Sequence, residues 1–138
     1  MKGKILLVDE WRAVRLLGRR VLTSLGLQTR EARSGLEALE TLILEPDLSG
    51  ILLEWNPQDP YCLELLKRLA AVPRHSRPAL VACGDVLERS QIIAALEAGA
   101  DDFLQKPFSQ ETVREKFEQL GVPGFSESRR AEQSPTVR

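Results

Sequence analysis

Apolar residues along the chain follow two spacings that alternate five times. Short apolar runs, which are typical of strands covered on both faces or lying at a sheet edge, occur at residues 4–8, 27–32, 48–53, 79–83 and 102–105. Each run is followed by a segment whose apolar residues have the spacing of an amphipathic helix, at residues 12–25, 34–44, 63–71, 88–98 and 110–120. The pattern therefore predicts five strand–helix pairs.

Start and stop signals agree with these helices. Gly26 and Gly99 follow the first and fourth helices, Pro46 ends the second, and Ser34 and Ser109 stand where N-caps belong. Strands that alternate with helices form βαβ units in a parallel sheet with helices on both faces. Because crossovers are right-handed, we expect strand order 2-1-3-4-5, the order of a doubly wound, flavodoxin-like α/β fold.

Length and composition suit a single soluble domain. Of the 138 residues, 43% are apolar and 28% are charged. We assign residues 1–121 to a domain, because residues 122–138 are polar, rich in Pro and Ser, and typical of a flexible tail or truncated linker. With no long apolar segment and no signal-peptide pattern, we expect a cytoplasmic protein that does not enter a membrane.

The charge balance narrows the range of partners. A net charge of −1 provides no general attraction to nucleic acid or anionic lipid, so a partner must be recognised by a local patch. The basic side chains of the first predicted helix are interpreted as a solvated face: Arg12, Arg15, Arg19 and Arg20.

Polar side chains gather where the predicted strands end. Asp9 and Glu10 follow the first strand, Glu54 and Asn56 follow the third, and Lys106 follows the fifth. In such a sheet the carboxyl ends of the strands share one edge, and ligands bind outside that edge. Carboxylates that converge there with an ammonium form a candidate site, and their oxygen atoms suit a hard cation such as Mg²⁺.

Four motifs carry a family resemblance: L-L-V-D-E at 6–10, E-W-N at 54–56, A-G-A-D-D-F-L at 98–104 and K-P-F at 106–108. On these motifs the chain resembles the receiver domains of two-component response regulators, in outline the stand-alone chemotaxis type. The resemblance extends over residues 4–120 without a gap.

In that family an aspartate at the end of the third strand accepts a phosphoryl group from a histidine kinase. The resemblance implies that Asp9 and Glu10 hold Mg²⁺, together with the acceptor at Glu54 and the backbone carbonyl of Asn56. It also implies that Lys106 pairs with the acceptor and the phosphate.

Three further positions follow from the resemblance. A Ser or Thr at the end of the fourth strand and an aromatic residue on the fifth transmit the phosphorylated state in relatives; here these positions are Gly84 and Phe103. Phe103 lacks the hydroxyl of the tyrosine often found there, so we predict a packed or partner-contacting residue. The Lys106–Pro107 peptide bond is expected to be cis, as in relatives.

The chain departs from the family pattern at the acceptor, at the hydroxyl position and in the loop at residues 56–62. Phosphoryl transfer depends on positioning, and the extra methylene of Glu54 displaces its carboxylate by roughly an ångström, which can cost about a hundredfold in rate. Gly84 has no hydroxyl to donate to a phosphoryl oxygen. We therefore predict an atypical receiver, a pseudo-receiver that works independently of phosphorylation.

Two interpretations of Glu54 remain open. Its carboxylate either mimics the phosphorylated state or preserves a salt bridge to Lys106 in a site out of use. A phosphoryl group adds about −1.5 to −2 charge, whereas glutamate carries −1. The carboxylates of Asp9, Glu10 and Glu54 repel one another unless Mg²⁺ or Lys106 compensates, so we predict weak Mg²⁺ binding at best.

The expected activity is protein–protein interaction through the surface of the fourth helix, fifth strand and fifth helix. A histidine kinase, an output protein or a second copy of the chain would bind there. Residues expected on this surface are Arg89, Glu97, Asp101, Phe103 and Gln105.

Alternatives stay open. In the first alternative the domain is a phosphorylatable receiver, in which Glu54 or the nearby Asp59 accepts a phosphoryl group from a histidine kinase while Mg²⁺ is bound. A thiol-based sensor would use Cys62 and Cys83, both of which we expect at the site end of the sheet. An enzyme is not expected, because phosphatases of this architecture need a second aspartate two residues after the nucleophile, and Trp11 stands there.

Overall fold

The structure is a computed structural model that describes residues 3–85, 89–122 and 125. Five strands form one parallel sheet in the order β2-β1-β3-β4-β5, which confirms the predicted topology. The strands are β1 (Lys4–Val8), β2 (Gln28–Ala32), β3 (Gly50–Glu54), β4 (Ala79–Gly84) and β5 (Asp102–Gln105).

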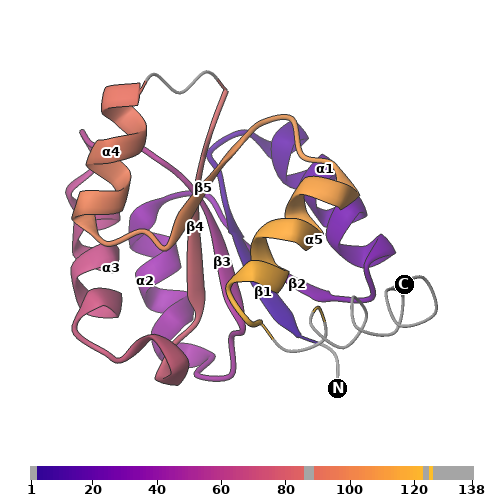
Figure 1. The fold of residues 1–138 in the computed structure, drawn as a ribbon, viewed down its shortest axis with the longest axis horizontal. Coiled ribbons are helices and arrows are strands. Elements are labelled where there is room, and N and C mark those ends of the chain that lie inside the picture. Colours follow the sequence, from indigo (N-terminus) through magenta and orange to yellow (C-terminus); the bar gives the residue numbers. More distant parts are fainter. Residues whose placement is uncertain (1–2, 86–88, 123–124, 126–138) are drawn as a thin grey trace, which may run out of the picture.

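Helices cover both faces of the sheet (Figure 1). They are α1 (Arg12–Ser24), α2 (Gly35–Leu44), α3 (Pro60–Ala70), α4 (Arg89–Ala98) and α5 (Gln110–Gln119), with a short 3₁₀ turn η1 (Arg74–Ser76) before β4. Helices α2, α3 and α4 lie on one face, and α1 and α5 lie on the other (Figure 1). The fold is therefore the doubly wound, flavodoxin-like arrangement that the sequence predicted.

The core consists of two layers separated by the sheet. Alternate side chains of each strand point to opposite faces. Leu6 and Val8 of β1 belong to the layer under α2, α3 and α4, whereas Ile5 and Leu7 belong to the layer under α1 and α5. This double burial explains why the central strands read as continuous apolar runs.

Two elements begin more than one residue away from the predicted position. β3 begins at Gly50, where a Cβ would lie 2.7 Å from the Phe117 ring, so glycine lets α5 pack against the strand. α3 begins at Pro60, three residues earlier than expected, because Asp59 caps it by accepting a hydrogen bond from the Tyr61 N–H. Proline at the first helical position has no N–H to leave unpaired.

The packed structure continues past Gly121. Val122 and Phe125 are both buried, and the Phe125 ring lies 5.4 Å from that of Phe117. Two residues of the stretch expected to form a tail thus belong to the hydrophobic core. The rest of that stretch lies outside the described residues.

Within the described ranges, no helix is long and apolar enough to cross a membrane.

Candidate functional site at the carboxyl ends of the strands

Three charged side chains from different strand ends meet at one point. The Lys106 Nζ atom, which follows β5, lies 2.7 Å from Oδ2 of Asp9 after β1 and 3.4 Å from Oε2 of Glu54 at the end of β3. Asp85, after β4, is farther away at 4.0 Å and is largely exposed. Asp9 and Lys106 are both buried, so their contact is the tightest charge pair of the site.

Lys106 remains an ammonium in this setting. Burial by itself would lower the pKa of Lys106, but the hydrogen bond and charge of Asp9, helped by Glu54 and Asp85, outweigh it and raise the pKa above its ordinary value. The site therefore holds a permanent positive charge at neutral pH, surrounded by carboxylates.

The loop that carries Asp9 is held on several sides. Its Oδ1 accepts a hydrogen bond from the Trp11 N–H at 2.9 Å, and its backbone carbonyl accepts one from the Arg15 guanidinium at 2.7 Å. Arg15 also pairs with Glu31 of β2 at 3.0 Å. Asp9 is thus fixed both through its side chain and through its backbone.

The interpretation of Arg15 as part of a solvated face is wrong. The side chain is buried, because it lies seven residues before Leu22 and shares the inward face of α1 with it. That spacing is a signal in the sequence that could have identified Arg15, whereas its hydrogen bond to the Asp9 carbonyl could not be foreseen.

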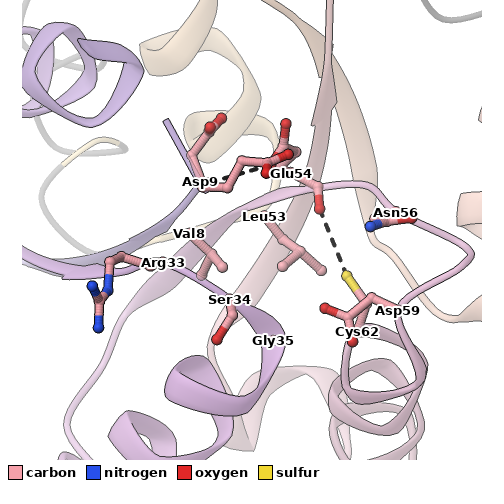
Figure 2. Close-up of a pocket in the computed structure, with 11 residues that line it drawn as sticks. Val8, Asp9, Arg33, Ser34, Gly35, Leu53, Glu54, Asn56, Asp59 and Cys62 are labelled. Atoms are coloured by element: carbon pink, nitrogen blue, oxygen red, sulfur yellow. Dashed lines mark hydrogen bonds between the residues drawn. The ribbon is translucent and has the colours of Figure 1, made fainter. Parts of the chain in front are cut away.

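Glu54 reaches the loop from the opposite side. Its Oε1 accepts a hydrogen bond from the Glu10 N–H at 3.3 Å, and Oε2 lies 3.4 Å from the Lys106 Nζ. Figure 2 shows Glu54 beside Asp9. The half-buried carboxylate thus spans from β3 to the β1–α1 loop. The Glu10 side chain itself is exposed.

A pocket of about 160 Å³ opens beside Glu54. It lies between the β1–α1 loop and the first turns of α2 and α3 (Figure 2), and Arg33, Asn56 and Asp59 contribute polar groups to its lining. Arg33 is already paired with Glu37 at 2.9 Å.

Three of the four predicted metal ligands, Asp9, Glu54 and Asn56, already have hydrogen-bond partners. Both carboxylate oxygens of Asp9 are engaged, and the Asn56 carbonyl accepts a hydrogen bond from the Asp59 N–H at 3.1 Å. In the described part of the chain, no group of three His, Cys, Asp or Glu side chains is placed to hold a metal ion. The oxygen chemistry of these side chains suits Mg²⁺, and the Lys106 ammonium lies among the same carboxylates.

The two switch positions lie on neighbouring strands but have separate surroundings. The Gly84 carbonyl accepts a hydrogen bond from the Lys106 N–H at 2.7 Å, and the Lys106–Pro107 bond is cis. Phe103 is half-buried against the core layer under α4, and the Lys116 Nζ of α5 lies 5.1 Å from its ring centroid. Lys116 also pairs with Asp102 at 3.3 Å. A cation–π contact from α5 therefore holds the aromatic ring.

Asp101, which was expected on the binding surface, forms a charge pair within the molecule. Its carboxylate forms two hydrogen bonds with the Arg77 guanidinium, at 2.8 and 3.0 Å, and accepts a third from the Leu80 N–H. Asp101 precedes β5 and joins this strand to the start of β4. The sequence alone could not show that Arg77 would be the neighbour of Asp101, so the partner contact expected of Asp101 stays a prediction beside this structural role.

The two cysteines lie at the site end of the sheet but on opposite faces. Cys62 belongs to the core layer under α2, α3 and α4, and Cys83 to the layer under α1 and α5. Both are buried, and burial raises the pKa of Cys62 to about 11 and that of Cys83 further still. Neither thiol has the depressed pKa of a reactive cysteine.

The sheet order, the Asp9–Glu10 pair, the carboxylate at the end of β3 and the lysine before a cis-proline together define a receiver-type signalling domain. Comparison with known proteins agrees: residues 5–118 match the family model described as the response regulator receiver domain. The chain belongs to this family, a family of two-component signalling modules that interact with histidine kinases or output proteins.

Relatives and solved structures cover almost the whole domain. A chemotaxis protein CheY homolog of Campylobacter jejuni is 29% identical over 125 residues, which is 90% of this chain and 96% of the relative. CheY-3 of Vibrio cholerae is 30% identical over 118 residues, 85% of this chain and 90% of the relative. A response regulator structure from Chloroflexus aurantiacus has a TM-score of 0.74 at 26% identity, covering 87% of this chain and 98% of that one.

Proposed function

We propose that this receiver domain acts in two-component signalling as a protein-interaction module that does not depend on phosphorylation. The observation that carries this proposal is the position of the Glu54 carboxylate. One oxygen accepts a hydrogen bond from the Glu10 N–H, which holds the carboxylate against the β1–α1 loop, and the other faces Lys106.

The chemistry of the acceptor supports this proposal. Phosphoryl transfer depends almost entirely on positioning and charge stabilisation. A carboxylate carried on one extra methylene and held toward the β1–α1 loop is displaced by roughly an ångström, which costs about a hundredfold in rate. A glutamate at this position is therefore a poor acceptor even if phosphodonor is supplied.

The interaction between Glu54 and Lys106 supports the salt-bridge interpretation over phosphate mimicry. A mimic would need a relay from the strand-end site to the aromatic residue of β5. Gly84 has no side chain to provide that relay, and Phe103 is held from α5 by Lys116. We therefore infer that the charge of Glu54 stabilises Lys106 and does not set the conformation of Phe103.

Lys106 also accounts for the proposed weakness of Mg²⁺ binding. An ammonium 2.7 Å from Asp9 supplies the positive charge that a divalent ion would otherwise supply. Placing Mg²⁺ beside that ammonium would add repulsion between two cations.

The partner would bind the surface formed by α4, β5 and α5, which we call the α4–β5–α5 surface. Arg89, Glu97 and Gln105 are exposed there, and Ile93 and Leu96 add apolar area. A histidine kinase or an output protein is the proposed partner class, and a second copy of the chain is the alternative.

The experiment that tests this function records amide NMR spectra before and after addition of Mg²⁺ with beryllofluoride or acetyl phosphate. We expect the resonances of Glu54, Gly84 and Phe103 to stay in place. Shifts at these residues would instead establish a phosphorylatable receiver, and mass spectrometry of a phosphorylated peptide would then tell Glu54 from Asp59.

A further inference from the structure

Helix α2 exposes three large aliphatic side chains. Leu36 is 44% exposed, Ile43 69% and Leu44 78%. The opposite face of the helix is already buried in the core through Ala38 and Leu39. A helix that is apolar on both faces is normally covered on both.

The exposed side chains form one continuous stripe. Leu36, Glu40, Ile43 and Leu44 stand at positions i, i+4, i+7 and i+8, which lie on the same side of an α-helix. This set is called the α2 stripe below. It runs along a helix of 10 residues, about 15 Å long, which is the length of a short helix–helix contact.

The charge on the α2 stripe is negative. Helix α2 contains no Lys or Arg, and its two acidic residues differ in their contacts. Glu37 accepts hydrogen bonds from Arg33 at the start of the helix, whereas Glu40 is exposed within the stripe. A surface with aliphatic side chains around one carboxylate complements an aliphatic surface that carries a cation.

The size of the stripe argues against a second copy of the chain. Its three aliphatic residues are far fewer than the roughly 20–30 residues that each partner contributes to a stable interface. Antiparallel pairing of two stripes would also bring one Glu40 toward the other. The surface suits a brief contact with a different and basic partner.

We propose that the α2 stripe docks an amphipathic helix of a partner protein, with aliphatic side chains against Leu36, Ile43 and Leu44 and a Lys or Arg opposite Glu40. Helix α2 packs against α3 and β2, at the sheet edge opposite β5 (Figure 1). The stripe and the α4–β5–α5 surface can therefore be occupied together. This inference does not depend on the proposed function, since the two surfaces are separate.

A model peptide tests the proposal on the intact chain. The probe is a synthetic helical peptide of about 14 residues, built from Ala and Leu with Lys flanking one leucine face, added to ¹⁵N-labelled protein. We expect amide shifts confined to residues 35–45 and a dissociation constant of roughly 0.1–1 mM, since the contact area is small. A peptide with Glu in place of each Lys should bind more weakly.

Charge reversal provides the decisive comparison. Glu40→Lys should weaken binding of the lysine peptide about two- to fivefold, the range of a surface ion pair, and should let the glutamate peptide bind. Glu115→Lys, an exposed control on α5, should change neither, and circular dichroism should show both variants folded. The proposal is overturned if shifts fall outside α2 or are absent, if the two variants behave alike, or if sedimentation shows a dimer formed through the stripe.

Discussion

The Lys106 ammonium lies closer to Asp9 than to Glu54, at 2.7 Å against 3.4 Å. Glu54, the residue that we propose stands in the place of the phosphate acceptor, is thus the secondary partner of the lysine. Asp9 and Lys106 are nearly inaccessible to solvent, so each depends on the other for compensation of its charge. Removing either member should leave an uncompensated charge in the interior.

Lys106→Met is expected to lower the free energy of unfolding by about 3–5 kcal/mol, because Asp9 loses its buried counter-charge. Glu54→Gln should cost no more than about 1 kcal/mol, because Glu54 is half-buried and Asp9 still pairs with the lysine. Urea titration followed by circular dichroism measures both. If both variants lost the same free energy of unfolding, Asp9 would not be the more important of the two carboxylates that pair with Lys106.

Arg15 and Arg19 can be compared directly because both pair with Glu31, Arg15 at 3.0 Å and Arg19 at 2.7 Å. Only Arg15 is buried and donates a hydrogen bond to the Asp9 carbonyl. Arg15→Met should cost about 2–3 kcal/mol of stability, whereas Arg19→Met should cost less than about 1 kcal/mol.

The same pair should differ in the NMR spectrum as well. Arg15→Met should move the amide resonances of residues 9–11, and Arg19→Met should not. If both variants shift the amide resonances of residues 9–11 to the same extent, then Glu31 and not Arg15 holds the loop that carries Asp9.

The Arg77–Asp101 pair should make stability depend on acid pH. Burial alone would raise the pKa of Asp101, but the Arg77 hydrogen bonds and the Leu80 N–H outweigh it and lower the pKa. A carboxylate with a lowered folded-state pKa stabilises the fold above its unfolded pKa of about 3.9, and this stabilisation is lost as pH falls through the folded value.

Asp101→Asn should therefore cost about 3 kcal/mol at pH 7, because Arg77 loses its partner, and much less once the pH has fallen below the lowered folded-state pKa of Asp101. Thermal or urea unfolding of both proteins across this range measures the difference. A difference that stays constant with pH would show that packing, and not charge, explains the loss.

The double variant Glu54→Asp with Gly84→Thr should restore a response to beryllofluoride. It shortens the acceptor and supplies a hydroxyl at the end of β4, the two features that we hold responsible for the loss. We expect amide shifts at Phe103 and a change in Trp55 fluorescence upon addition of Mg²⁺ and beryllofluoride. Each single variant should show smaller changes in both signals. A double variant that shows no change would mean that another feature of the site prevents the response.

The cysteines should remain free thiols under mild oxidation. Cys62 and Cys83 lie on opposite faces of the sheet, and burial raises the pKa of Cys62 to about 11. Intact mass after treatment with peroxide or oxidised glutathione should show no disulfide and no adduct, whereas the urea-unfolded chain should react readily. Rapid modification of the folded protein would revive the thiol-sensor alternative.

Local signals in the sequence were sufficient for most of the fold. The spacing of apolar residues, the Ser34 and Ser109 caps and the glycines after helices act over a few residues, so the elements and the 2-1-3-4-5 order could be predicted. Family motifs placed the charged side chains at one edge of the sheet, since parallel strands bring their ends together.

Only the tertiary structure decided which of these charges pair. The sequence placed Lys106 near both Asp9 and Glu54, but distances of 2.7 and 3.4 Å come from the packing of strands about 100 and 50 residues apart. In the same way, Arg15 pairs with Glu31 and Asp101 pairs with Arg77 because the fold places residues of different elements side by side. Pairing between distant side chains depends on how layers pack, and no local pattern along the chain contains that information.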